Sequence, residues 1–295
     1  MEKDLHIQHD LLSLAIVTHL NNWLNLVYKP IQYLIANNLY KAEESGTFPS
    51  LAEAEREDRD LSAESPTFHK LENPTFYKLE SLPPGYEQIE YFDRCAAEYD
   101  LVTGPFTAAI WSEVYKTIQP LVKENDSILN ACCGTGTESM WFAEMAPKGK
   151  ITSTDLSVGM TAIAFAKCLQ ANKTNMEFFQ QDVADLPAAW SGQFQVTYCQ
   201  LSLPYLSSWR EALEQLFRVT APGGLMILLE SEATWYNKVF YSLVESICPA
   251  YREIIEEREL REALSDLGCS SIYTKRILPG INLIICMTRK LSTRL

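Results

Sequence analysis

Short apolar runs alternate with amphipathic segments through most of the second half of the chain. The apolar runs have the length and composition of buried strands and occur at residues 128–132, 150–155, 176–179, 194–199 and 225–229. The intervening segments carry apolar residues at helical spacing and occur at residues 137–145, 160–171 and 209–219. Such alternation predicts a mostly parallel sheet with helices on both faces.

The N-terminal part has a different pattern. Apolar residues at three- and four-residue spacing predict a helix over residues 5–43 that breaks at Pro30. Residues 41–64 are acidic and lose this periodicity, which indicates a solvated helix or a linker. We therefore predict a helical appendage over residues 1–89 and a main domain over residues 90–295.

A short repeat lies within the appendage. Pro66-Thr-Phe-His-Lys-Leu-Glu is followed by Pro74-Thr-Phe-Tyr-Lys-Leu-Glu. Two copies are too few for a solenoid, so the favoured interpretation is a pair of proline-started turns. The alternative is a lid over a substrate pocket, with His69 or Tyr77 facing the substrate.

Composition narrows the range of partners. The chain has 25 basic and 38 acidic residues and a formal net charge of −13, which disfavours a nucleic-acid partner because phosphate backbones require basic surfaces. No apolar run is long enough to cross a bilayer, and the N-terminus lacks a signal-peptide layout, so we expect a cytoplasmic protein. The eight cysteines lack paired metal-ligand spacing, and we expect no metal site.

The candidate chemistry begins where the first apolar run ends. Residues 130–136 read Asn-Ala-Cys-Cys-Gly-Thr-Gly, a pattern that predicts a strand end, a glycine turn and a helix start. Gly134 and Gly136 would let a ligand approach the backbone, and the following helix would offer free N–H groups. Asp155 ends the next run about twenty residues later, where a nucleotide-binding βαβ unit has its ribose-binding acid.

Two ligands use this arrangement, a dinucleotide and S-adenosylmethionine. The dinucleotide fingerprint needs a third glycine where the chain has Ser139. A second acid, Asp182, follows the third apolar run at a position that suits an adenine amino group, and Ala221-Pro-Gly-Gly precedes the fifth run. These features favour S-adenosylmethionine and disfavour a nicotinamide-dependent oxidoreductase.

Taken together, the motifs resemble the class I S-adenosylmethionine-dependent methyltransferase family over residues 90–290. The resemblance implies an α/β fold with a seven-stranded, mostly parallel sheet, helices on both faces and a C-terminal antiparallel hairpin after a helix at residues 251–267. Asn130 stands where the family usually has Asp, and Cys132 where it usually has its first Gly. We hypothesise that the neutral Asn130 weakens cofactor binding.

The resemblance also assigns a site. The residues that it implies for cofactor binding are Tyr99, Asn130, Ala131, Cys132, Gly134, Gly136, Asp155, Leu156, Met160, Gln181, Asp182, Val183, Gln200 and Leu201. Tyr99 ends a segment similar to the entry helix of small-molecule methyltransferases, in which a tyrosine closes over the cofactor. The catalytic candidates are Tyr99, Gln200, Tyr205 and His69; residues 90–295 contain no histidine, and His69 is the one nearest to that domain.

The implied activity is in-line methyl transfer from S-adenosylmethionine to a small biosynthetic molecule without a metal, giving S-adenosylhomocysteine. Such a displacement chiefly needs the acceptor to be oriented and water to be excluded. Two alternatives are a non-methylating S-adenosylmethionine-binding protein of the same fold and a peptide or protein methyltransferase. A homodimer through the N-terminal helices is the expected assembly.

Overall fold

The computed structural model describes residues 67–69, 87–235, 237–239, 241–242 and 251–288. They fall within residues 63–295, which form one compact unit. The helix predicted over residues 5–43, the acidic segment and the second copy of the repeat lie outside the described residues. The predicted boundary between residues 89 and 90 stays a prediction.

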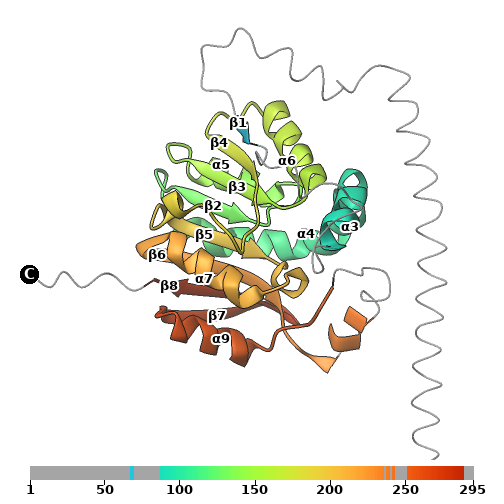
Figure 1. The fold of residues 1–295 in the computed structure, drawn as a ribbon, viewed down its shortest axis with the longest axis vertical. Coiled ribbons are helices and arrows are strands. Elements are labelled where there is room, and N and C mark those ends of the chain that lie inside the picture. The colour runs from blue at the N-terminus through green and yellow to red at the C-terminus, as the bar shows by residue number, and fades with distance from the viewer. Residues whose placement is uncertain (1–66, 70–86, 236, 240, 243–250, 289–295) are drawn as a thin grey trace, which may run out of the picture. The chain divides into compact units, whose positions relative to one another are not determined.

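Eight strands of the described residues form one sheet in the order β1-β4-β3-β2-β5-β6-β8-β7 (Figure 1). Their bounds are β1 Thr67–His69, β2 Ile128–Ala131, β3 Ile151–Asp155, β4 Met176–Gln180, β5 Phe194–Gln200, β6 Thr220–Ser231, β7 Ser270–Leu278 and β8 Ile281–Met287. The pairs among β1 to β6 are parallel, and β8 is antiparallel to β6 and to β7. Strands β2 to β8 confirm the predicted seven-stranded sheet and its closing hairpin.

Strand β1 was not predicted. The first copy of the repeat was expected to form a turn, which is wrong for Thr67–His69: these residues pair in parallel with Glu177, Phe178 and Phe179 of β4. The physical reason is that β4 would otherwise present an open edge, and a threonine–phenylalanine segment suits an added strand. The compact unit therefore includes chain that was assigned to the appendage.

Helices cover both faces of the sheet. The longer helices are α3 Glu87–Cys95, α4 Tyr99–Ile118, α5 Thr137–Met145, α6 Val158–Gln170, α7 Trp209–Val219 and α9 Glu257–Asp266. Helices α4, α5 and α6 share one apolar core with the sheet, and α7 and α9 share the other (Figure 1). Among the described residues no helix combines the length and apolarity needed to cross a bilayer.

Two element boundaries differ from the sequence prediction. Strand β6 starts at Thr220 rather than at residue 225, because Thr220 pairs with Phe194 of β5 before the Pro-Gly-Gly segment. Helix α9 is shorter than predicted, since residues 251–256 have no regular structure. The backbone N–H of Arg252 instead donates to the Pro204 carbonyl at 2.9 Å, which ties this segment to the loop after β5.

The order in which strands are added to the sheet reverses at β2. From β2 the chain adds β3 and then β4 on one side, and β5 then pairs with the other side of β2. In such sheets, ligands bind outside the carboxyl ends of the strands at this switch point. The segments that follow β2, β3 and β5 are therefore the place to look for a site.

Candidate functional site

A glycine loop joins β2 to α5. Cys132, Gly134 and Gly136 have φ angles of 52°, 53° and 76°, a region that favours glycine. A Cβ on Gly136 would lie 2.6 Å from Cβ of Ala164, so close packing of the loop against α6 requires glycine there. A Cβ on Gly134 would meet nothing within 4 Å, so the space beside the backbone is open there.

Asp155 at the end of β3 closes one side of this space. Its Oδ2 accepts a hydrogen bond from the Gly134 N–H at 2.8 Å, and its Oδ1 accepts one from the Ser157 N–H at 2.9 Å. Desolvation raises the pKa of Asp155 to about 6, although both N–H bonds oppose the shift. A carboxylate has about four lone-pair positions, so the side chain can still accept hydrogen bonds from a ligand.

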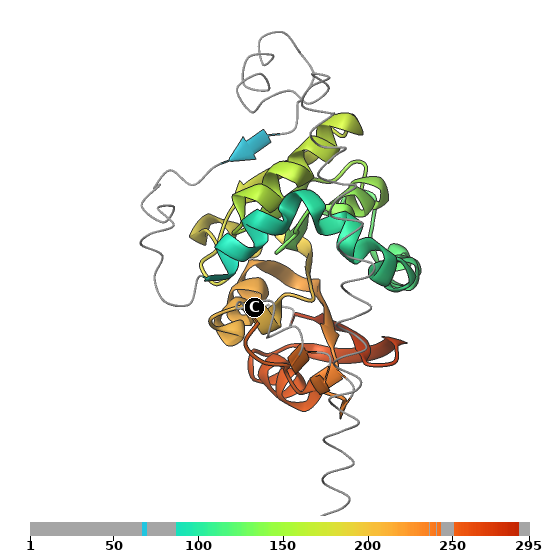
Figure 2. The same cartoon turned by 90° about the vertical axis from the view of Figure 1, so that its right-hand side faces the viewer.

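Helix α3 is anchored beside this loop. Asp93 Oδ1 accepts hydrogen bonds from the Ser157 hydroxyl at 2.5 Å and from the Gly159 N–H at 2.9 Å. Gly159 permits the approach, because a Cβ there would lie 3.1 Å from Cβ of Ala96. Figure 2 shows α3 and the start of α4 running beside α6.

Tyr99 is the first residue of α4, and contacts of its neighbour hold it beside the glycine loop. The carboxylate of its neighbour Asp100 accepts a hydrogen bond from the Thr135 hydroxyl of the glycine loop and pairs with Lys167 of α6. Burial, followed by the charges of two carboxylates at the site, holds the pKa of Tyr99 above its usual range; the carboxylates belong to Glu138 and Asp155. The Tyr99 side chain therefore lies beside the open space at the loop.

A polar chain crosses the site from α5 to β5. The amide of Gln200 donates to Oε1 of Glu138 at 2.8 Å, and Oε1 of Gln200 accepts from the Tyr198 hydroxyl at 2.5 Å. Glu138 is 7% exposed, and burial raises its pKa. Buried carboxyl groups of this kind are better partners for a cation than for an anion.

Aromatic rings continue from Tyr99 past the loop after β5. Phe92 lies 6.4 Å from Tyr99 and 5.6 Å from Tyr205 between ring centroids. Tyr205 meets Tyr251 edge to face at 5.8 Å, and Tyr251 stacks on Tyr241 at 4.8 Å. We call Tyr205, Tyr251 and Tyr241 the tyrosine row. Its spacings are those of favourable aromatic pairs. Tyr205 is partly exposed, whereas Tyr241 and Tyr251 are buried.

Comparison with known proteins decides the family. Residues 128–224 match a family described as "Methyltransferase domain". This domain belongs to the class I S-adenosylmethionine-dependent methyltransferases. A demethylmenaquinone methyltransferase of Lactococcus lactis is 36% identical over 127 residues, which are 42% of this chain and 50% of that protein. The chain thus spans about half the length of this curated relative.

Solved structures agree on the fold. An O-methyltransferase family protein from Burkholderia thailandensis has a TM-score of 0.58 at 15% identity, over 69% of this chain and 62% of that one. A SAM-dependent methyltransferase from Aquifex aeolicus has a TM-score of 0.50 at 16% identity, over 59% and 88% of the two chains. At these identities the likeness concerns the architecture of the methyltransferase domain alone.

S-adenosylmethionine, the cofactor of this family, suits the site of the methyltransferase domain. It carries a ribose, for which Asp155 has acceptor positions left, and a positive sulfonium, for which Glu138 and Asp155 are suitable neighbours. The open space at Gly134 allows its contact with the backbone. The positive charge of Lys167 is already paired with the Asp100 carboxylate, which reduces its repulsion of the sulfonium.

Asn130 has a structural partner in the methyltransferase domain. Its side chain is 2% exposed, and its amide donates to the Ser139 hydroxyl oxygen at 2.8 Å. The Ser153 hydroxyl also reaches Ser139 Oγ, at 2.8 Å. Two departures from the familiar motifs, Asn130 and Ser139, are thus bonded to each other. The predicted contact of Asn130 with the cofactor stays a prediction.

The other predicted positions after β4 adopt a local turn. Asp182 Oδ1 accepts from the Ala184 N–H at 2.8 Å. The Gln181 N–H donates to the Asp155 carbonyl at 3.0 Å, and its side-chain amide donates to the Asp185 carbonyl at 2.5 Å. These bonds place the turn beside Asp155 and leave the predicted adenine contact of Asp182 untested.

Sequence reasoning passed over Gln180, which pairs with Asp155 across the two strands. It is 1% exposed, its amide donates to the Leu156 carbonyl at 3.2 Å, and its Oε1 has no hydrogen-bond partner within the described ranges. A buried acceptor without a donor at this edge is a candidate contact for a ligand N–H or O–H. Three other predicted cofactor residues lie in the apolar interior: Ala131, Met160 and Val183.

The remaining predicted residues lie at two places. Cys132 is partly exposed, and its hydrogen bond with Cys199 together with burial raises its pKa well above the usual value. Leu201 has a φ of 48°, and its N–H donates to the Leu229 carbonyl at 2.7 Å, which turns the chain after β5. His69 ends β1, and the strands β4 and β3 lie between it and β2. Its catalytic role stays a prediction.

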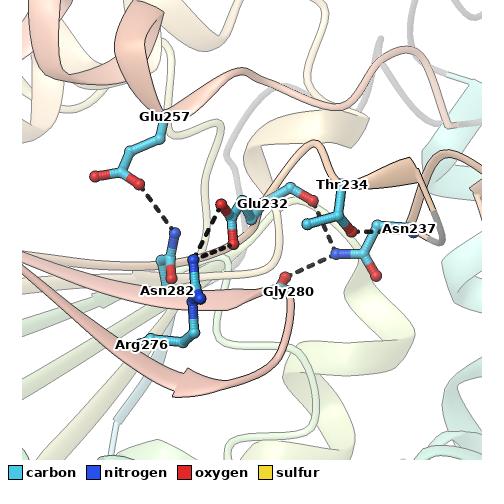
Figure 3. Close-up of polar contacts among 7 residues, drawn as sticks. All are labelled: Glu232, Thr234, Asn237, Glu257, Arg276, Gly280 and Asn282. Atoms are coloured by element: carbon cyan, nitrogen blue, oxygen red, sulfur yellow. Dashed lines mark hydrogen bonds and ion pairs between the residues drawn. The ribbon is translucent and has the colours of Figure 1, made fainter.

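Hydrogen bonds fix the segment that follows β6 (Figure 3). The Asn237 amide donates to the carbonyls of Glu232 and Gly280, at 2.8 Å and 2.7 Å. Arg276 of β7 pairs with the Glu232 carboxylate at 3.1 Å. The chain leaving β6 is thereby held against the turn of the β7–β8 hairpin, before it reaches Tyr241.

Proposed function

We propose that this protein transfers a methyl group from S-adenosylmethionine to a small aromatic molecule. The cofactor part rests on Asp155, which is bonded to the glycine loop at Gly134, and on the charges of Glu138 and Asp155, which both act on Tyr99. The comparisons support a methyltransferase and lend nothing to a non-methylating protein of the same fold.

The acceptor part rests on two observations. Tyr205 of the tyrosine row is partly exposed in the loop after β5, where the acceptor of such a domain is expected. The relative from Lactococcus lactis is named for demethylmenaquinone, which contains a fused aromatic ring. We therefore infer a planar, ring-bearing acceptor of the naphthoquinol type.

The residues of the chain would divide the work as follows. The bound cofactor supplies an electrophilic methyl group on a positive sulfur. Asp155 would fix the ribose, the carboxylate of Glu138 would stabilise the positive charge, and Tyr99 would cover the site against water. The tyrosine row would hold the acceptor ring in line, which is the main requirement of such a displacement.

A ligand-stability experiment tests the cofactor part. At a hundred times their dissociation constants, S-adenosylmethionine and S-adenosylhomocysteine should each stabilise the fold by about 2.7 kcal/mol, and NADH should not. Asp155→Ala should lose the effect, whereas Asp185→Ala, which changes an exposed acid in the turn after β4, should keep it. Stabilisation by NADH alone would contradict the proposal.

Three further proposals concern the localisation and the partners of this enzyme. We propose a cytoplasmic enzyme that does not bind nucleic acid, in line with the net charge of −13, and a homodimer formed through residues 5–43. Light scattering of the full chain would test the dimer, and a monomeric mass would contradict it.

A further inference from the structure

Glu230 is a buried acid that the function described so far does not use. It lies near the carboxyl end of β6 and is 4% exposed. Its Oε1 accepts hydrogen bonds from the backbone N–H groups of Ser202 and Leu203, at 3.3 Å and 3.2 Å. Its Oε2 is buried and has no hydrogen-bond partner in the described part of the chain. A buried carboxylate oxygen without a donor is costly, which makes it a candidate for a ligand contact.

The strand beside Glu230 does not satisfy this oxygen. Asn282 of β8 lies directly opposite Glu230 in the antiparallel pair, so the two side chains are on the same face of the sheet. The Asn282 amide donates away from Glu230, to Oε2 of Glu257 at 3.2 Å (Figure 3). The amide of the residue opposite Glu230 is therefore engaged with α9.

Two tyrosine hydroxyls near Glu230 also have other partners. Tyr198 donates to Oε1 of Gln200 at 2.5 Å, and the hydroxyl of Tyr241 is bonded to Ser231 Oγ at 2.6 Å. Burial raises the pKa of both tyrosines, that of Tyr241 to about 12, and the charge of Glu230 adds to the effect on each. Glu230 thus lies within electrostatic reach of both groups without a hydrogen bond from either.

One end of the tyrosine row is held by η6, which is bonded to Glu230, and the other end is held by the next residue of β6. Tyr241 is held by the hydroxyl of Ser231, the residue next to Glu230 in β6. Tyr205 ends the short 3₁₀ helix η6, Leu203–Tyr205, whose first N–H donates to Glu230 itself. An aromatic molecule bound against the partly exposed Tyr205 would therefore lie close to the Glu230 carboxylate, and a hydroxyl on its ring could supply the missing donor.

We propose that Glu230 accepts the proton of a hydroxyl group carried by the aromatic acceptor. The inference rests on the proposed function, since it names the base for that methyl transfer. The acceptor O–H bond breaks and its proton moves to Oε2, while Oε1 stays on the two backbone N–H groups. The electron pair left on oxygen makes the acceptor nucleophilic at that oxygen or at a conjugated ring carbon, which would afterwards release its own proton to water. The new bond forms to the methyl carbon as the carbon–sulfur bond breaks and its electron pair stays on sulfur.

The acid–base properties of Glu230 agree with this role. Burial raises its pKa to about 8, and the N–H bonds from Leu203 and Ser202 oppose the shift. A base with a pKa near the working pH is the most effective one, because enough of it is ionised and it still binds a proton well. Tyr198 and Tyr241 lie within electrostatic reach of it, and Asn282 of β8 and Glu257 of α9 lie on its face of the sheet; none of these four carries a positive charge.

Binding of two naphthalene probes tests the contact without turnover. Above pH 8, where Glu230 is ionised, and with S-adenosylhomocysteine present, the wild-type protein should bind 1-naphthol about tenfold or more tightly than 1-methoxynaphthalene, since only naphthol can donate to Oε2. Glu230→Gln should lose this preference, because an amide can donate to either oxygen. Glu214→Gln, which changes an exposed acid of α7, should keep it. An equal preference in Glu230→Gln and wild type, or no binding of naphthol to wild type, would overturn the inference.

Turnover separates this inference from the proposed function. With reduced naphthoquinone as acceptor, Glu230→Gln should lower kcat about 10²-fold or more, and leave KM for S-adenosylmethionine unchanged. The rise of wild-type kcat toward an apparent pKa of about 8 should vanish in the variant. Undiminished turnover with the same pH profile in Glu230→Gln would refute the role of Glu230 and leave the methyltransferase intact. Naphthol binding that depends on Glu230, without S-adenosylhomocysteine formed from any acceptor, would refute the proposed methyl transfer and leave the contact intact.

Discussion

Cofactor affinity should depend on the protonation of Asp155. In the free protein its pKa is raised to about 6 from 3.8, because desolvation outweighs the hydrogen bonds from Ser157 and Gly134. Ribose hydroxyls donate to the ionised carboxylate, and the sulfonium charge also favours this form. Binding should therefore lower the pKa again, and the affinity for S-adenosylmethionine should rise with pH up to about pH 6 and level off above it.

The magnitude follows from the two pKa values. If the bound pKa returns to 3.8 or below, binding at pH 5 requires the loss of a proton that the free protein holds. Each pKa unit corresponds to about 1.4 kcal/mol, so affinity at pH 5 should be about tenfold weaker than at pH 7. Burial raises the pKa of Glu138 as well, which weakens binding at low pH in the same way. Tenfold is therefore the minimum difference in affinity between pH 5 and pH 7.

Calorimetric titration between pH 5 and pH 8 measures this effect. Asp155→Asn should bind the cofactor more weakly and lose the part of the pH dependence that belongs to Asp155, and Glu138→Gln should lose the other part. Asp185→Asn serves as the control, because this acid is exposed in the neighbouring turn. The reasoning is refuted if the double variant keeps the full pH dependence, or if affinity falls as pH rises toward 6.

Three further results are expected. Gly136→Ala should destabilise the fold by about 2 kcal/mol or more in denaturant titrations, because the new Cβ would lie 2.6 Å from Cβ of Ala164 at a φ of +76°. As the control, Gly104→Ala in α4 should stabilise the fold by about 0.5–1 kcal/mol, because a Cβ there would meet nothing within 4 Å. Burial raises the pKa of Glu230, so the folded state holds its proton more tightly than the unfolded state, and the free energy of unfolding should fall by about 3 kcal/mol between pH 5 and pH 8. Glu230→Gln should lose this part of the fall, and an equal fall in the variant and the wild type would contradict its origin in Glu230. Asn237→Ala should lose two hydrogen bonds to carbonyl groups and about 1–3 kcal/mol of local stability, measured as faster proteolysis after β6, and an unchanged cleavage rate would count against the bonds.

The sequence predicted those elements whose signals are local. Helix α7 has the predicted bounds, Trp209–Val219, because its cap is local: Ser208 Oγ accepts from the Glu211 N–H at 3.3 Å. Helix α5, Thr137–Met145, also has the predicted bounds and begins directly after Gly136. Buried parallel strands are continuous apolar runs, so β2 to β5 could be found without knowledge of their partners.

The features that were missed depend on contacts between distant segments. Glu138 is important because it meets Gln200, and no local pattern marks an acid in the first turn of α5 as buried. Glu230 reads as the polar end of an apolar strand until the loop after β5 folds over it. Strand β1 depends on the open edge of β4, which sequence periodicity does not reveal. The choice of partner, rather than the choice of helix or strand, is what the sequence leaves open.

The charge of the site bears on turnover as well as on binding. Desolvation disfavours the ionised forms of Asp155 and Glu138 and raises the pKa of each. Lys167 lowers the pKa of Glu138, but it is already paired with Asp100. A cationic cofactor would relieve this cost when it binds, because it favours both ionised carboxylates. Methyl transfer removes the positive charge from sulfur, so the product should lose that stabilisation while it keeps the ribose contacts. We therefore expect the site to bind S-adenosylmethionine through charge and ribose together and S-adenosylhomocysteine through the ribose alone, so the difference in affinity between cofactor and product should widen as the pH rises and both carboxyl groups become ionised.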